Sequence, residues 1–305
     1  MRYEGQAPRG RNKLSKADVC KQQHSSISVI VPAYNHANFL RERIETITKQ
    51  SQKPAEIIFL DDGSTDGTLR VIMELMKTIS YSNYILVNTQ NSGSPFRQWK
   101  RGLDSATGDY IWIAEADDSS DLRFLERMLS ALRIEPKTNF AFCYSLSLDN
   151  PHPGICSDQY KTFYEHYGRG LIGTSQYINS NQFLKKYLSV RNIIPNVSSV
   201  LWRTRHLRTV YDQLGDQAFK FRICGDWQFY VKSCAMSGMV YHDSRPMNYH
   251  RKHKNSVSTL IPIKQHFAEV LEVHRLVKRL CSQDTEVAKI ILEDEQLLTG
   301  QWDLT

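Results

Sequence analysis

The chain has 305 residues, of which 41% are hydrophobic and 23% are charged, as is usual for a folded globular protein. No stretch approaches the roughly 18 apolar residues of a membrane span, and the N-terminus lacks the apolar core of a signal peptide. We therefore expect a cytoplasmic protein, either soluble or peripheral at the inner face of the membrane.

The net charge of +7 is unevenly distributed. Residues 1–26 contain six Lys and Arg against two acidic residues, a balance of +4, which leaves +3 for the rest of the chain. Such a polar segment cannot bury a core, so we interpret 1–26 as a disordered basic tail. Contact of this tail with anionic lipid is an alternative. Nucleic-acid binding is not expected.

The cysteines show neither CxxC pairs nor a regular spacing. In a cytoplasmic chain this pattern indicates reduced thiols, and not disulfides or zinc ligands. The six are Cys20, Cys143, Cys156, Cys224, Cys234 and Cys281.

Apolar runs and amphipathic segments alternate from residue 27 onward. This alternation predicts an α/β fold with a mostly parallel central sheet and helices on both faces. In such sheets, ligands bind beyond the carboxyl ends of the strands. We expect strands at 27–34, 56–62, 83–88, 109–116 and 140–145, and helices between them at 37–50, 66–79, 96–106 and 121–132.

The pattern is looser in the second half of the chain. Residues 149–173 resemble a loop-rich insertion. We expect one domain in two halves, 27–145 and 146–260, followed by C-terminal helices in 261–305. The later elements are a helix at 181–188, a strand at 198–203, a helix at 225–238, a strand at 239–242 and two helices from 263.

Two groups of carboxylates follow predicted strands. Asp61 and Asp62 end the strand EIIFLDD, and Glu115, Asp117 and Asp118 follow the apolar run YIWI. Both groups should lie on one edge of the sheet. Carboxylates side by side repel unless a cation lies between them, and Mg²⁺ or Mn²⁺ prefers oxygen ligands. A metal that binds a diphosphate is the functional interpretation, and a simple turn is the alternative for residues 61–64.

Three motifs in order make the sequence similar to the inverting family 2 glycosyltransferases of the GT-A fold. They are VPAYN (31–35), DDGSTDGT (61–68) and ATGDYIWIAEADD (106–118). The resemblance is strong over residues 28–132 and looser to about 258. It implies that 27–145 is the nucleotide-sugar-binding half of a GT-A domain and 146–260 the acceptor-binding and catalytic half. It also implies a Mg²⁺ or Mn²⁺ cofactor.

The resemblance carries roles over to single residues. Glu115 and Asp117 would be the acidic ends of the family's Asp-x-Asp motif, with Asp117 a metal ligand, although Glu115 departs from the usual Asp. Contacts to the nucleotide-sugar would come from Pro32, Ala33 and Tyr34 at the nucleobase and from Asp61 or Asp62 at the base or ribose.

The segment NSGSPFRQWKRG (91–102) departs from the family, because Gln98 and Trp99 stand where the family has Arg-Asn. The resemblance leaves Arg97 or Lys100 as a candidate for the missing phosphate contact. We expect Trp99 to pack within its helix.

Gly225-Asp226-Trp227 opens an amphipathic segment. Asp226 is either a helix N-cap or, by the resemblance, the catalytic base of an (Glu/Asp)-Asp-Trp/Tyr motif whose first acid is Gly225 here. An Asp is ionised at neutral pH, so it can accept the proton of an acceptor hydroxyl.

The basic stretch YHRKHKNSVS (249–258) is either a solvated charge run or an ordered segment similar to the family's C-terminal region. In the second interpretation, Arg251 and His253 would face the diphosphate or the metal.

These features predict a glycosyltransferase that moves a sugar from a nucleotide-diphospho-sugar to an acceptor hydroxyl with inversion. The acceptor would be a glycan or a lipid-linked molecule in surface polysaccharide or lipid-linked glycan synthesis. A non-catalytic nucleotide- or glycan-binding module is the alternative, because Glu115 and Gly225 depart from the family pattern. A nucleotidyltransferase, which would release pyrophosphate, is another. The C-terminal helix FAEVLEVHRLVKRL (267–280) either packs on the core or lies on an anionic membrane.

Overall fold

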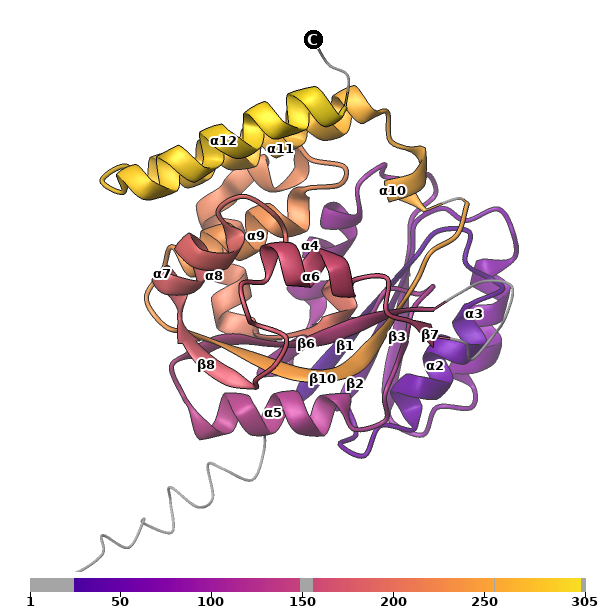
Figure 1. The fold of residues 1–305 in the computed structure, drawn as a ribbon. Helices are drawn as coiled ribbons and strands as arrows, with labels where there is room; N and C mark the ends of the chain where they lie inside the picture. The colour runs from indigo at the N-terminus through magenta and orange to yellow at the C-terminus, as the bar shows by residue number, and fades with distance from the viewer. Residues whose placement is uncertain (1–24, 149–155, 255, 303–305) are drawn as a thin grey trace, which may run out of the picture.

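The computed structural model describes residues 25–148, 156–254 and 256–302. The predicted basic tail lies outside these residues apart from positions 25 and 26, as do Cys20 and the start of the predicted insertion (149–155). One mixed sheet runs through the molecule, with helices on both faces (Figure 1). The predicted α/β architecture is confirmed.

The sheet is built from strands of very different length. They are β1 (Ile27–Ala33), β2 (Glu56–Asp61), β3 (Ser82–Val87), β4 (Tyr110–Ile113), β5 (Ser119–Ser120), β6 (Thr138–Leu148), β7 (Cys156–Ser157), β8 (Gln176–Asn179), β9 (Val200–Arg203) and β10 (Met239–Arg251). Their order is β3-β2-β1-β4-β9-β6-β10-β5, with β7 beside β6 and β8 beside β10. β3, β2, β1 and β4 pair in parallel, whereas β9 is antiparallel to both β4 and β6.

The helices fall into two layers. One layer holds α5 (Phe124–Ile134), below the sheet in Figure 1, and α2 (Leu40–Thr48) and α3 (Thr68–Met76), to the right of it. The layer above holds α4 (Pro95–Ser105), α8 (Thr204–Leu214), α9 (Gly225–Cys234), α11 (Ile263–Leu280) and α12 (Thr285–Gln301). Shorter helices are α6 (Lys161–Tyr167), α7 (Ser180–Phe183), the π-helical turn η1 (Leu184–Leu188), the 3₁₀ turns η2 (Val197–Ser199) and η3 (Gly215–Phe219), and α10 (Val257–Leu260).

The central strands are apolar on both faces because each face is covered by helices. In β1, Ile30 packs into the core under α4, α8 and α9, whereas Val29 and Val31 pack into the core over α2, α3 and α5. Each side of the sheet therefore has its own core, and the strand ends are left to form the site.

Three predicted elements differ from the structure. The helix expected at 66–79 spans Thr68–Met76, and Asp66 accepts hydrogen bonds from Thr68 N–H and Oγ1–H just before it. The helix expected at 181–188 divides into α7 and η1. The strand expected to end at residue 242 continues to Arg251, with breaks in register around Pro246. Proline is tolerated in a strand at such irregularities.

The C-terminal helix packs on the core, which favours the first of the two interpretations given above. Val270, Val273 and Val277 of α11 are buried, and Phe267 and Leu276 pack against them. Among the described residues, we find no helix with the length and apolar character needed to cross a bilayer. Of the described cysteines, Cys143, Cys224, Cys234 and Cys281 are buried and Cys156 is exposed.

Candidate functional site

The loop after β1 is fixed to the loop after β2. Asn35 has a left-handed backbone (φ 57°), which asparagine tolerates better than most residues. Its N–H donates to Ser64 Oγ and its Oδ1 accepts from Thr65 N–H. His36 N–H donates to Thr68 Oγ1. The VPAYN and DDGSTDGT motifs thus form one unit, which presents the His36 side chain at the carboxyl edge of the sheet.

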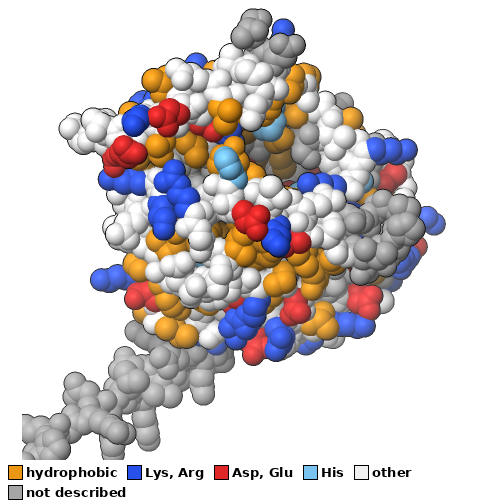
Figure 2. Space-filling model, in the orientation of Figure 1, with side chains coloured by type: hydrophobic (Ala, Val, Ile, Leu, Met, Phe, Trp, Pro, Cys, Tyr) orange, Lys and Arg blue, Asp and Glu red, His pale blue; other side chains and the backbone are white. Residues whose placement is uncertain are grey.

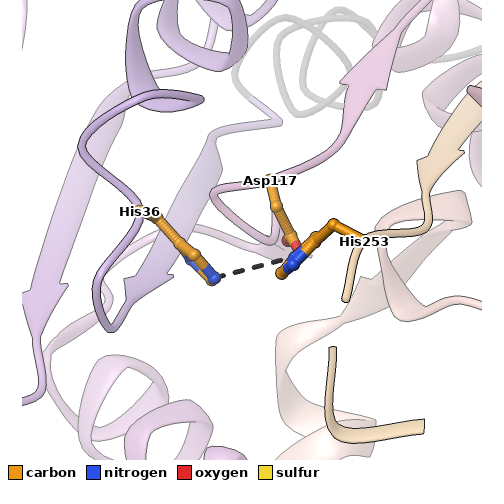
Figure 3. Close-up of side chains that lie close together, drawn as sticks. All are labelled: His36, Asp117 and His253. Carbon is orange, nitrogen blue, oxygen red and sulfur yellow. Dashed lines mark hydrogen bonds and ion pairs between the residues drawn. The ribbon is translucent and has the colours of Figure 1, made fainter. Parts of the chain in front are cut away.

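The side chains of His36, Asp117 and His253 come from separate loops and lie close together (Figure 3). His253 Nε2 lies 3.0 Å from Asp117 Oδ2, and His36 Nε2 lies 4.0 Å from the same oxygen. Burial by itself raises the pKa of Asp117, but His36 and His253 outweigh it and hold that pKa well below its usual range. One ligand atom from each of the three residues lies within 4.8 Å of the others. The cluster therefore has the chemistry of a divalent-cation site.

Asp118 joins three segments of the chain. Its Oδ2 accepts hydrogen bonds from Ser198 Oγ–H (2.6 Å) and Asn196 Nδ2–H (2.9 Å), and its Oδ1 accepts from Arg251 N–H (3.0 Å). Both carboxylate oxygens are therefore engaged inside the protein. Asp118 shapes the site by tying η2 and the end of β10 to the loop after β4.

Glu115 lies beside these carboxylates, and its Oε2 accepts from Asn196 Nδ2–H at 3.4 Å. Burial, followed by the charges of Asp118 and Asp117, raises the pKa of Glu115 well above its usual range. Glu115 therefore holds a proton more readily than Asp117 does.

A buried arginine lies beneath the carboxylates. The Arg43 side chain is 0% exposed, its guanidinium carbon lies 4.7 Å from the centre of the Trp112 ring, and Nη1 donates to Ser120 Oγ. Burial lowers the pKa of Arg43 to about 10 in spite of the nearby Asp118, so it remains a cation at neutral pH. The positive charge of Arg43 therefore helps the chain to tolerate the clustered carboxylates. No pattern in the sequence had indicated this role for Arg43.

Arg251 lies next to the cluster and is buried. Its Nε–H donates to the carbonyl oxygen of Asp117 and its Nη2–H to Glu42 Oε2 at 2.6 Å. The segment around Arg251 is therefore ordered, which favours that interpretation of 249–258 over a solvated charge run. In this arrangement Arg251 holds the Asp117 backbone, and its contact with a diphosphate stays a prediction.

The expected nucleobase pocket lies at the ends of β1 and β2. Pro32 and Ala33 are the last residues of β1, and Tyr34 is 43% exposed just beyond them. The Asp62 carboxylate accepts four hydrogen bonds from the loop after β3 and from α4. The donors are Asn88 Nδ2–H, Ser92 N–H, Ser92 Oγ–H and Gln98 Nε2–H. Asp61 Oδ1 accepts only a long bond of 3.3 Å from Ser64 N–H among the described residues. Asp62 therefore organises the following loop, and of the two carboxylates Asp61 has fewer partners among the described residues. A ligand contact of either carboxylate stays a prediction.

Helix α4 carries the departures from the family pattern. Gln98 donates to Asp62 Oδ1, and Trp99 is buried against Phe96 and Phe229, as expected for helix packing. The exposed Arg97 guanidinium lies 4.8 Å from the centre of the Phe219 ring. Arg97 is thus positioned by η3 and not by a carboxylate of the cluster, and its phosphate contact stays a prediction.

Asp226 lies in the first turn of α9, and the cap position is Cys224. The N-cap interpretation of Asp226 is therefore wrong. Its Oδ1 accepts from Trp227 N–H (2.7 Å) and its Oδ2 from Asn192 Nδ2–H (2.9 Å). Burial raises the pKa of Asp226 to about 7. The charge of Asp226 also contributes to the raised pKa of Glu115, so the two carboxylates are close enough to interact.

The residue before Asp226 has a steric reason to be glycine. A Cβ at Gly225 would lie 2.3 Å from two carbons of the Phe96 ring. No acidic side chain fits there unless Phe96 moves. The departure at position 225 is therefore matched by the phenylalanine of α4, and it leaves Asp226 in place.

The two sequence comparisons with known proteins agree with each other. The family model described as "Glycosyl transferase family 2" matches residues 28–224, more than half of the chain. A putative glycosyltransferase, EpsE, of Bacillus subtilis is 39% identical over 107 residues, which are 35% of this chain and 38% of that protein. The GalNAc(5)-diNAcBac-PP-undecaprenol beta-1,3-glucosyltransferase of Campylobacter jejuni is 30% identical over 158 residues, 52% of this chain and 47% of that protein. The chain thus matches less than half the length of these curated relatives.

Solved structures share the fold at low sequence identity. S. aureus TarS 1–349 in complex with UDP-GlcNAc has a TM-score of 0.61 and 18% identity, covering 83% of this chain and 66% of that one. The mannosyltransferase PcManGT from Pyrobaculum calidifontis, in complex with GDP-Man and Mn²⁺, has a TM-score of 0.54 and 19% identity, covering 89% and 69%. The GT-A architecture expected from the sequence is confirmed.

Proposed function

This chain belongs to glycosyl transferase family 2, and from that premise we propose that it transfers a sugar from a nucleotide-diphospho-sugar to an acceptor hydroxyl with inversion of configuration. The observation that carries the proposal is Asp226, a carboxylate in the first turn of α9 that Trp227 and Asn192 hold in place and whose pKa burial raises to about 7. A pKa near the working pH suits a group that must accept a proton and then release it.

Asp226 is the base in this proposal. The Trp227 N–H and the Asn192 amide each donate to one oxygen of its carboxylate, which fixes the plane of the group. The lone pairs that remain can accept the proton of an acceptor hydroxyl as that oxygen attacks the anomeric carbon. Because base and diphosphate then lie on opposite sides of the sugar, attack inverts the configuration.

The residues around Asp117 fit a divalent metal, Mg²⁺ or Mn²⁺. His253 Nε2 and Asp117 Oδ2 are separated by 3.0 Å, and nitrogen and oxygen atoms of these two kinds would hold such an ion. His36 would be a third ligand. A set with two histidines favours Mn²⁺ over the harder Mg²⁺. A bound metal would neutralise charge on the leaving diphosphate, while Arg251 holds the Asp117 backbone from behind.

The donor is proposed to bind between the loops after β1, β2 and β4. Pro32, Ala33, Tyr34 and Asp61 would contact the nucleoside. Figure 2 shows a hollow beneath the C-terminal helices on one face of the molecule. The structural neighbours crystallised with UDP-GlcNAc and with GDP-Man support a nucleotide-sugar as the ligand.

The acceptor is proposed to be a growing glycan, either free or linked to a lipid. The names of the relatives support this class, since they include an undecaprenol-linked glucosyltransferase and a glycosyltransferase of amylovoran biosynthesis in Erwinia amylovora. An acceptor of this class places the protein on the cytoplasmic side of a membrane, at least transiently.

The proposal is tested in two steps. First, melting is followed with UDP-, GDP- and dTDP-sugars, each with Mn²⁺ or with EDTA, and one nucleotide class should raise the melting temperature only with metal. Second, release of the nucleoside diphosphate is measured for the wild type, for Asp226→Asn and for the exposed control Asp212→Asn.

Asp226→Asn should keep the ligand-dependent melting shift and lose at least about 100-fold in turnover, while Asp212→Asn behaves as the wild type. Full turnover by Asp226→Asn would place the base elsewhere. Metal-dependent binding without turnover in the wild type would favour a non-catalytic module. This second candidate is retained because Gly225, which the Phe96 ring requires to be small, stands where the family motif has an acidic residue.

A further inference from the structure

We propose that Asn192 positions the Asp226 carboxylate for proton transfer, and that the C-terminal helices α11 and α12 hold Asn192 in place. The inference rests on the proposed role of Asp226 as the base. Asn192 lies in the connection between η1 and η2, 34 residues before Asp226 in the sequence. No motif marks it.

The orientation of the Asn192 amide follows from its two partners. Its Oδ1 accepts the N–H of Ile194 (3.1 Å), and its Nδ2–H donates to Asp226 Oδ2 (2.9 Å). A backbone N–H can only donate and an ionised carboxylate can only accept, so the reversed amide would lose both bonds. The side chain is thus locked with its donor toward Asp226.

The C-terminal helices fix the segment that carries Asn192. The neighbouring Arg191 forms a buried ion pair with Asp294 of α12. Val190, the residue before Arg191, is held by α11, because His274 Nε2 lies 3.1 Å from its carbonyl oxygen. Two helices therefore hold the two residues before Asn192.

The same helices fix the segment that carries Asp226. The Glu269 carboxylate of α11 accepts hydrogen bonds from the successive N–H groups of Arg222, Ile223 and Cys224, at 2.9 to 3.1 Å. These N–H groups precede the first turn of α9, where Asp226 lies. The two segments that meet in the Asn192–Asp226 hydrogen bond are therefore attached to one support, which lies beyond the residues that match the family model.

The charge environment gives the hydrogen bond a measurable consequence. Burial and the charge of Glu269 raise the pKa of Asp226, whereas the bonds from Trp227 and Asn192 lower it. Loss of the Asn192 donor should therefore make the carboxylate harder to ionise. The titratable groups that act on Asp226 or respond to its charge are Glu115 from the loop after β4, Glu269 from α11, and Cys224 and Tyr230 on either side of it along the chain.

Two variants separate positioning from folding. Asn192→Asp keeps an oxygen for the Ile194 N–H but turns a second carboxylate oxygen toward Asp226 in place of the donor, so it adds charge repulsion to the loss of the bond. Asn192→Ala removes both bonds. Asn181→Asp, on the exposed start of α7, is the matched control, because it makes the same charge change away from the site.

The acid limb of the kcat–pH profile should move upward by about one pH unit or more in Asn192→Asp and Asn192→Ala. At pH 7, kcat should fall roughly tenfold or more, with the donor KM within about twofold. The carboxyl carbon of Asp226, assigned by its absence in Asp226→Asn and followed by NMR titration, should show the same upward movement. This second readout needs no turnover.

An unchanged Asp226 titration in both Asn192 variants would overturn the inference, whether or not the protein turns over. If Asp226→Asn is inactive but the Asn192 profiles superimpose on that of the wild type, Asn192 has no positioning role and the proposed function stands. If Asp226→Asn is as active as the wild type, it is the proposed base that fails.

Discussion

Asp226→Asn should stabilise the folded protein at high pH even though it removes the proposed base. In the folded chain the pKa of Asp226 is raised from 3.8 to about 7 by burial. Between these two values the folded state holds a proton that the unfolded state has released, so the free energy of unfolding falls as the pH rises. The destabilisation is complete above about pH 7. An asparagine at this position does not titrate and should escape it.

The size of the effect follows from the two pKa values. A rise from 3.8 to about 7 corresponds to about 4 kcal/mol at 1.36 kcal/mol per pH unit, of which about 2.6 kcal/mol develops between pH 5 and pH 8. Asp226 retains partial contact with solvent, so we halve this figure to about 1.3 kcal/mol. A constant loss of about 1 kcal/mol is added at every pH, because the new amide faces the donor of Asn192.

The measurement is urea unfolding of the wild type, Asp226→Asn and the control Asp212→Asn at pH 5, 6, 7 and 8. The difference in unfolding free energy between Asp226→Asn and the wild type should move in favour of the variant by about 1–1.5 kcal/mol from pH 5 to pH 8. The control should show a flat difference. A flat difference for Asp226→Asn as well would mean that Asp226 ionises normally in the folded protein, and the main support for its role as base would be lost.

Three further variants test other contacts of the site. His253→Ala should weaken Mn²⁺ binding by roughly tenfold or more in isothermal titration, whereas the exposed His166→Ala should not; equal affinities would exclude His253 as a ligand. Gly225→Ala should destabilise the protein by about 1–3 kcal/mol, because the new Cβ would meet the Phe96 ring. Phe96→Leu in the same chain should recover part of this loss, and additive effects of the two changes on the free energy of unfolding would argue against the contact. Glu269→Gln should cost about 1–3 kcal/mol, because three N–H groups share its carboxylate, and an unchanged urea midpoint would contradict this.

The parallel half of the sheet was predictable from local patterns. Strands such as YIWI are short apolar runs followed by turn residues, and their carboxyl ends must meet at one edge. The resemblance to family 2 glycosyltransferases implied that Asp117 would bind a metal and that His253 would face the diphosphate or the metal, and the structure has the two side chains 3.0 Å apart. Each of these expectations depended on a motif that is contiguous in the sequence.

The remaining contacts depend on distance in space, which no local pattern encodes. His36 follows the VPAYN motif as an ordinary loop histidine, and only its approach to Asp117 gives it a role. The extension of β10 past residue 242 was missed because Pro246 indicates a break, yet the proline fits where the register with β6 shifts. Asn192 is a single amide in an irregular segment, and its importance comes from Asp226, which lies on another element.

The contacts of Asp118 also determine when during folding the site can form. Its bond to the Arg251 N–H spans 133 residues, and the ion pair of Arg251 with Glu42 spans 209. Contacts so distant in sequence close late, because the loop entropy must be overcome before they contribute. On the ribosome, the carboxylates would therefore stay without their final geometry until most of the chain has emerged. A fragment that ends before β10 would carry the VPAYN and DDGSTDGT motifs but not the contacts that Arg251 and His253 make with the loop after β4.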